Sequence, residues 1–242
     1  MTTVGFLYPG HAAEDDYPRM RRALLPSLAD LELAVEHTYG EDLHAIDELL
    51  DLGSERRLAD GAARLRAKRP AAVVWACTSG SFVYGWAGAR EQADKLAVAA
   101  GVPASSTSFA FVDAAHALGV RRVAVVASYP DEVAGKFVEF LTSAGVDVIA
   151  MSSQGIDTAA EVGRLTDDDV LALAKANDNA DADALLIPDT AMHTIATIDA
   201  IESAIGKPVL TANQVTVWHG LRLAGLSARS AEVGALFRAA HN

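Results

Sequence analysis

The chain has 242 residues and a hydrophobic fraction of 51%, which suffices for one large α/β domain or for two small lobes. Its 20 Lys and Arg against 32 Asp and Glu give a formal net charge of -12. That charge repels a phosphate backbone, and the basic residues form no stripe along the sequence. We therefore expect neither nucleic acid nor an anionic membrane as a partner.

The chain starts with MTTVGFL, which resembles a first β-strand and carries no basic leader and no small-residue cleavage signal. No apolar run approaches the ~20 residues that a membrane-spanning helix needs. We expect a soluble, cytoplasmic protein. A single cysteine, Cys77, rules out an intrachain disulfide and a cysteine-rich zinc site.

Short aliphatic runs alternate with helical stretches along the whole chain, the pattern of repeated βα units and a parallel sheet. We expect strands near 3–8, 31–37, 71–76, 103–107, 122–128, 146–151, 184–188 and 208–212. We expect helices near 17–29, 54–68, 84–100, 109–118, 131–144, 167–177, 194–205 and 214–224. Thr166 precedes three aspartates and is expected to cap one of these helices.

The second half of the chain repeats the first weakly but in order. Residues 4–9 recur at 123–130, the strand before Cys77 recurs before Asp189, and residues 102–107 recur at 207–213. This predicts an α/β fold of two pseudosymmetric lobes, each a parallel sheet flanked by helices. We place the lobes at residues 1–119 and 120–242, with the last helix free to pack back on the first lobe and the active site in the cleft between them.

The two strand ends that correspond in this repeat carry reactive side chains. Cys77 follows the apolar run 71–76, and Asp189 follows the run 184–187. Parallel sheets bind ligands at these carboxyl ends, so we expect both side chains to face one cleft. A helix N-terminus next to Cys77 would lower the pKa of its thiol and make it a base or nucleophile, with Asp189 as acid, base or orienting group. The alternatives are a buried structural cysteine and a helix-capping aspartate.

The loops around these residues are rich in hydroxyls and poor in Arg and Lys, so an anion would be held by hydroxyls and backbone N–H groups. The first strand is not followed by a dinucleotide-binding glycine pattern, and no P-loop is present. Asp189 with His193, and His11 with nearby acidic residues, lack a recognised metal-ligand spacing. We expect neither a cofactor nor a metal.

At these residues the chain resembles the aspartate/glutamate racemase superfamily, and most closely its maleate isomerases and arylmalonate decarboxylases. The resemblance rests on residues 8–10, 77–82 and 118–124, Tyr129 and the strand before Asp189. It implies a two-lobed fold and cofactor-independent chemistry at a carbon next to a carboxylate. It also implies a set of substrate-binding residues around Cys77 and Asp189: Pro9, Gly10, Thr78, Ser79, Tyr129, Thr190 and Ala191.

The chain departs from these relatives at its reactive positions. Racemases and maleate isomerases of this group use two cysteines, whereas the second position here is Asp189. Arylmalonate decarboxylases have glycine at the first position and cysteine at the second, the reverse of this chain. Maleate isomerases also have an asparagine after the first strand, where this chain has residues 9–11, Pro-Gly-His.

From the residues and the resemblance together we expect a cofactor-independent isomerase or decarboxylase of a small mono- or dicarboxylic acid. Cys77 is the expected nucleophile or acid–base group, and Asp189 its partner. One alternative is a carboxylate-binding or sensing protein that has lost catalysis. Another is an amino-acid or hydantoin racemase that uses Cys77 and Asp189 as its two bases. The expected partner is the small carboxylate substrate, and assembly into a homo-oligomer is left open.

Overall fold

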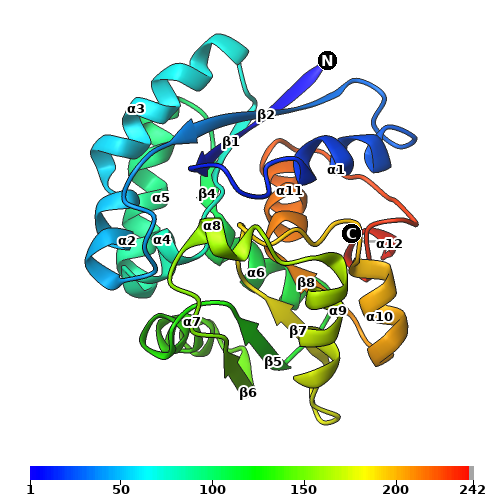
Figure 1. The fold of residues 1–242 in the computed structure, drawn as a ribbon. Helices are drawn as coiled ribbons and strands as arrows, with labels where there is room; N and C mark the ends of the chain where they lie inside the picture. The colour runs from blue at the N-terminus through cyan, green and yellow to red at the C-terminus, as the bar shows by residue number, and fades with distance from the viewer. Residues whose placement is uncertain (240–242) are drawn as a thin grey trace.

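The first four strands form a parallel sheet that supplies one side of the molecule (Figure 1). The structure is a computed structural model, and it describes residues 1–239. The strands are β1 (Thr2–Pro9), β2 (Leu31–Thr38), β3 (Ala72–Trp75) and β4 (Ala104–Ser106), in the order β2-β1-β3-β4. β3 is buried along its whole length, as expected for a central strand covered on both faces.

The second half of the chain forms another parallel sheet with the corresponding strand order. Its strands are β5 (Arg122–Ala127), β6 (Asp147–Ser153), β7 (Ala184–Ile187) and β8 (Val209–Thr211), in the order β6-β5-β7-β8. The expected two-lobed α/β fold is confirmed, and every expected strand is present to within two residues. Residues 107–121 separate the two sheets along the chain, and the division at residue 119 stays a prediction.

Helices surround both sheets (Figure 1). The longer ones are α1 (Asp16–Leu24), α3 (Glu55–Leu65), α5 (Gly85–Ala100), α6 (Thr107–Ala117), α7 (Asp131–Ser143), α9 (Asp167–Ala176), α10 (Ile198–Ile205) and α11 (Ala212–Leu223). Each corresponds to an expected helix, although α1 ends at Leu24 rather than near 29 and α10 begins at Ile198 rather than near 194. Thr166 caps α9 with a capping box, as predicted.

The sequence reading missed the short helices. They are α2 (Ile46–Leu52), α4 (Ser79–Phe82), α8 (Ala159–Val162), α12 (Ala235–Arg238) and a 3-10 turn, η1 (Arg66–Lys68). Segments this short complete at most two turns, so their apolar residues show no helical period. No described helix is both long and apolar enough to cross a membrane.

The two halves are joined by α6 and α11, the helices that follow the last strand of each sheet. The hydroxyls of Thr107 on α6 and Thr216 on α11 lie 2.6 Å apart and are buried. α11 also packs on the first sheet: a Cβ atom at Gly220 would lie 2.8 Å from Cγ1 of Val4, so only glycine permits this approach. One apolar core therefore includes residues of both sheets.

Candidate active site

A cavity of about 220 Å³ lies at the carboxyl ends of β1, β3 and β7. Residues from both halves line it: Tyr8, Pro9, Gly10, His11, Gly40, Glu41, Asp42, Leu43, His44, Leu49, Leu52, Cys77, Ser79, Ala159, Asp189, Thr190 and Ala191. Cys77 and Asp189 thus share one cavity. Strand order explains this, because β3 and β7 are inner strands of their sheets and end in loops that meet.

Cys77 lies immediately beyond β3, and its side chain is only 4% exposed. The Gly80 N–H donates a hydrogen bond to its sulfur at 3.2 Å, and the Ser79 hydroxyl lies 3.7 Å from it. Burial nevertheless raises the pKa of the thiol from 9.0 to about 11, because these hydrogen bonds do not compensate for desolvation and the Asp189 charge adds to it. The expected lowering of this pKa is therefore wrong. The resting group is a protonated thiol.

Asp189 is held in place by its own turn and by the neighbouring strand end. Its Oδ1 accepts a hydrogen bond from the Ala191 N–H at 2.8 Å, and its Oδ2 accepts one from the Ser128 hydroxyl. The residue is 3% exposed. It does not cap a helix near residue 194, where the carboxylate of Asp16 accepts the Thr194 N–H instead.

Five of the seven expected substrate-binding residues line the cavity, namely Pro9, Gly10, Ser79, Thr190 and Ala191. The Ala191 N–H, expected to bind substrate, is already bonded to Asp189.

The other two, Thr78 and Tyr129, are fully buried and are not among the residues that line the cavity. Tyr129 donates its hydroxyl to the Pro188 carbonyl at 2.8 Å. The Thr78 hydroxyl has no hydrogen-bond partner among the described residues. All seven assignments stay predictions.

The sequence reading missed His44, which projects into the cavity from the loop between β2 and α2. Its Nδ1 lies 2.9 Å from the Ile156 carbonyl, and its backbone N–H donates to the Asp157 carbonyl at 2.7 Å. Its Nε2 lies 3.9 Å from Oδ2 of Asp189. A loop residue whose contacts lie more than a hundred positions away carries no local sequence signal.

The same loop ties the halves together at a second point. The Asp42 carboxylate accepts the N–H groups of Ala159 and Ala160 at 2.7 and 3.1 Å. Tyr8 forms a third link, because its hydroxyl donates to the Thr190 carbonyl at 2.8 Å. These polar contacts fix the two walls of the cavity relative to each other.

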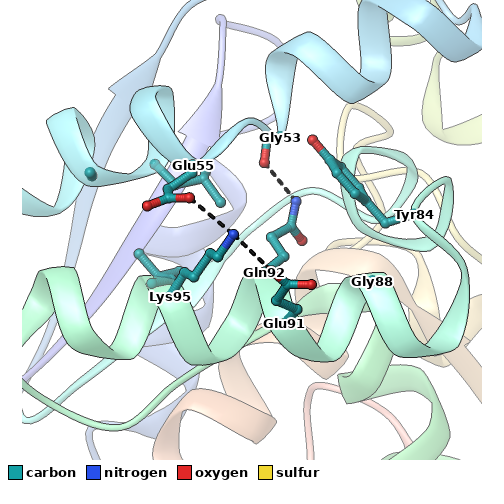
Figure 2. A pocket seen from close by; sticks show the side chains of 10 residues that line it. Gly53, Glu55, Tyr84, Gly88, Glu91, Gln92 and Lys95 are labelled. Carbon is teal, nitrogen blue, oxygen red and sulfur yellow. Dashed lines mark hydrogen bonds and ion pairs between the residues drawn. The ribbon is translucent and has the colours of Figure 1, made fainter.

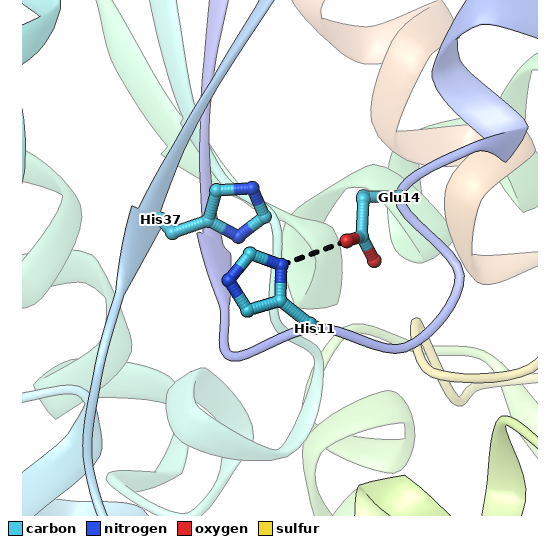
Figure 3. Close-up of side chains that lie close together, drawn as sticks. All are labelled: His11, Glu14 and His37. Carbon is cyan, nitrogen blue, oxygen red and sulfur yellow. Dashed lines mark hydrogen bonds and ion pairs between the residues drawn. The ribbon is translucent and has the colours of Figure 1, made fainter.

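One cluster near the cavity mouth has the composition of a metal site: His11, Glu14 and His37 (Figure 3). His11 Nδ1 lies 2.8 Å from the Glu14 carboxylate, and His37 Nδ1 lies 2.6 Å from the Gly10 carbonyl. The centroids of the two imidazole rings are 3.9 Å apart and the rings are tilted by 32°, and one ligand atom from each of the three residues lies within 4.8 Å of the others. Hydrogen bonds to Glu14 and to the Gly10 carbonyl already engage the Nδ1 atoms of both rings, and the expected absence of a metal stays a prediction.

A second hollow of about 130 Å³ lies between α3 and α5 (Figure 2). Lys95 crosses it and pairs with Glu55 and Glu91 at 3.1 and 2.8 Å. Gln92 donates to the Gly53 carbonyl at 2.8 Å. Its lining contains neither a thiol nor an imidazole, so the cavity at Cys77 is the better candidate for chemistry.

Comparison with known proteins identifies the family of the chain. A family model described as arylmalonate decarboxylase matches residues 42–237, so the chain belongs to the arylmalonate decarboxylase family. It is an enzyme of the isomerase or decarboxylase type.

Three relatives illustrate the similarity. The chain is 30% identical to an arylmalonate decarboxylase of Bordetella bronchiseptica over 175 residues, 72% of this chain and 73% of the relative. It is 26% identical to a maleate isomerase of Alcaligenes faecalis over 202 residues, 82% and 78% of the two chains.

The third relative is a liganded arylmalonate decarboxylase variant with one glycine changed to cysteine and one cysteine changed to serine. It superposes with a TM-score of 0.86 at 26% identity and covers 98% of this chain and 99% of its own.

Proposed function

We propose that this enzyme decarboxylates a small malonate-type dicarboxylic acid without a cofactor, with Cys77 as the proton donor. The observation that carries the proposal is the protonated Cys77 thiol, which burial and Asp189 hold at a pKa of about 11 inside the cavity. A group that keeps its proton at neutral pH is suited to protonating a carbanion.

The reaction balances with this one donor. The bond between the α-carbon and the departing carboxylate breaks, and its electron pair moves into the retained carboxylate to give an enediolate and CO₂. The Cys77 S–H then protonates the α-carbon, which restores the retained carboxylate, and the resulting thiolate takes a proton from water. No redox step is involved.

The lining of the cavity suits both carboxylates. Leu43, Leu49 and Leu52 form an apolar part of the wall, where loss of a charged group as neutral CO₂ is favoured. Ser79 and the neighbouring turn supply hydrogen-bond donors to the retained carboxylate, whose charge grows in the transition state. Asp189 orients the site from the second sheet.

The relatives support this assignment. By the resemblance described above, arylmalonate decarboxylases have glycine and cysteine where this chain has Cys77 and Asp189. On that resemblance the glycine-to-cysteine, cysteine-to-serine variant carries its cysteine at the position of Cys77, and its structure is that of a liganded form.

A second candidate is cis–trans isomerisation of an unsaturated dicarboxylate, which the similarity to maleate isomerase favours. It would proceed by addition of the Cys77 thiolate to the double bond, rotation and elimination. That path first requires transfer of the thiol proton to a base such as Asp189.

Proton NMR in deuterated water separates the two reactions. We expect aryl- or alkylmalonates to release CO₂ and to gain one deuterium at the α-carbon. If the enzyme converts maleate to fumarate and leaves malonates unchanged, its activity is isomerisation and not decarboxylation.

A further inference from the structure

The ring of His44 is held between two oxygen atoms of the second half of the chain. Nδ1 lies 2.9 Å from the Ile156 carbonyl, which can only accept, so Nδ1 carries a proton. Nε2 is therefore the ring nitrogen left to interact with another group. It faces Oδ2 of Asp189 at 3.9 Å, and this distance exceeds a direct hydrogen bond.

The ring is buried at this place and oriented by its neighbours. His44 is 7% exposed, and its ring packs edge-on against Tyr129 with 5.0 Å between centroids. Its backbone N–H is bonded to Asp157. These contacts fix Nε2 beside Asp189 at the edge of the cavity that also contains Cys77.

The charges around the cavity make His44 important for an anionic substrate. Among the described residues that line it, only His11 and His44 can carry a positive charge, and neither Lys nor Arg is present. His11 is exposed and bonded to Glu14. An ionised Asp189 repels a carboxylate, and a proton on Nε2 of His44, 3.9 Å from Oδ2 of Asp189, would offset that charge.

We propose that His44 and Asp189 form a pair that binds the retained carboxylate of the substrate through a proton on Nε2 of His44 and stabilises the enediolate that develops there. The pair selects carboxylate substrates because its proton is available only to a hydrogen-bond acceptor. The inference rests on the proposed function for the identity of that carboxylate. In this proposal Asp189, which follows a strand of the second sheet, acts at the position where the relatives have a second cysteine.

Other titratable groups face the pair. Tyr129 lies against the ring of His44, Cys77 shares the cavity, and Glu41 and Asp42 belong to the loop of His44. The Asp42 carboxylate is bonded to two backbone N–H groups at α8. The test therefore compares two reagents at one pH, so that titration of these groups affects both reagents alike.

Alkylation of Cys77 measures the charge of the pair without any substrate. Cys77 is the only cysteine, so one added mass reports its reaction with iodoacetate, an anion, or with neutral iodoacetamide. The ratio of the two rates, divided by the ratio for free cysteine, is measured for the wild type, His44→Asn, Asp189→Asn and the double variant. His44→Asn keeps a donor near the Ile156 carbonyl, and His116→Gln, an exposed histidine outside the cavity, is the matched control.

We expect the ratio to fall about tenfold in His44→Asn, because an uncompensated Asp189 then repels iodoacetate. It rises in Asp189→Asn, returns close to the wild-type value in the double variant, and is unchanged in His116→Gln. If His44→Asn does not fold, His44→Gln and Asp189→Asn carry the test. A ratio that responds to neither the His44 nor the Asp189 substitution overturns the proposal.

Turnover separates this inference from the proposed function. For an active malonate, His44→Asn should lower kcat about 100-fold, the usual effect of losing one donor to a developing oxyanion. If the alkylation rates follow the predicted pattern but no malonate is decarboxylated, the proposed reaction is refuted and the proposed pair is supported. If a folded His44→Asn variant decarboxylates the malonate at the wild-type rate, the proposed role of the pair is refuted and the proposed reaction is supported.

Discussion

The backbone N–H of Gly80 donates a hydrogen bond to the sulfur of Cys77 at 3.2 Å, in the first turn of α4. Such a donor stabilises a thiolate, yet the pKa of Cys77 is raised to about 11, because burial outweighs the hydrogen bond and Asp189 adds a like charge. The turn can therefore stabilise a thiolate that forms during the reaction, although the thiol stays protonated in the free enzyme.

This thiol should alkylate slowly at neutral pH. We expect the rate of iodoacetamide labelling to rise about tenfold per pH unit, because only the thiolate reacts, and to level off only near pH 11. The chain unfolded in guanidinium chloride is the control and should level off near 9.0. A plateau of the folded protein below neutral pH would show an activated thiolate and would contradict the proton-donor role.

The same pKa predicts how stability depends on pH. The folded thiol keeps its proton between pH 9.0 and about 11, whereas the unfolded chain loses it, so stability falls as pH rises through this interval. The loss amounts to about 3 kcal/mol. Cys77→Ala removes it, together with the part of the raised pKa of Tyr17 and Tyr129 that the Cys77 charge causes. Urea unfolding of the two proteins across this interval checks the difference, and parallel stability curves would contradict it.

Tyr8→Phe should loosen the contact between the two cavity walls. Its hydroxyl donates to the Thr190 carbonyl at 2.8 Å and accepts from the Ala13 N–H at 2.9 Å. Loss of both buried hydrogen bonds should lower the free energy of unfolding by about 1–3 kcal/mol. Tyr39→Phe, at an exposed tyrosine, is the control and should change it little. Equal effects of the two substitutions in urea titrations would contradict the inferred link.

The contact between the Thr107 hydroxyl on α6 and the Thr216 hydroxyl on α11 should contribute to stability. Thr107→Val leaves the Thr216 hydroxyl without this partner and should cost about 1–3 kcal/mol. The double change to valine removes both polar groups and should cost less than the sum of the single changes. Urea unfolding of the four proteins gives the coupling energy, and strict additivity would show that the 2.6 Å contact does not contribute.

Sequence patterns predicted the parts of this structure that depend on local periodicity. The aliphatic runs gave all eight strands because a strand buried on both faces is apolar throughout, and the ordered repeats gave the two sheets. The shared cavity of Cys77 and Asp189 also followed, since corresponding strands of a repeated unit end at corresponding edges.

Features that depend on tertiary contacts could not be predicted in this way. His44 and Ser128 reach Asp189 only because the loop after β2 and the end of β5 meet it in space. The sequence predicts a lowered pKa for Cys77 because it indicates a neighbouring helix start, but it does not indicate the depth of burial, which raises the pKa instead. The depth of burial determines the sign of the shift.

The central claim is that Cys77 delivers the proton to one face of the enediolate. A prochiral disubstituted malonate, treated in deuterated water and analysed by NMR and chiral chromatography, tests this most directly. The account predicts one enantiomer with a single α-deuterium, and a rate that falls by about 100-fold or more in Cys77→Ala. A racemic product, or undiminished turnover in folded Cys77→Ala, would contradict it.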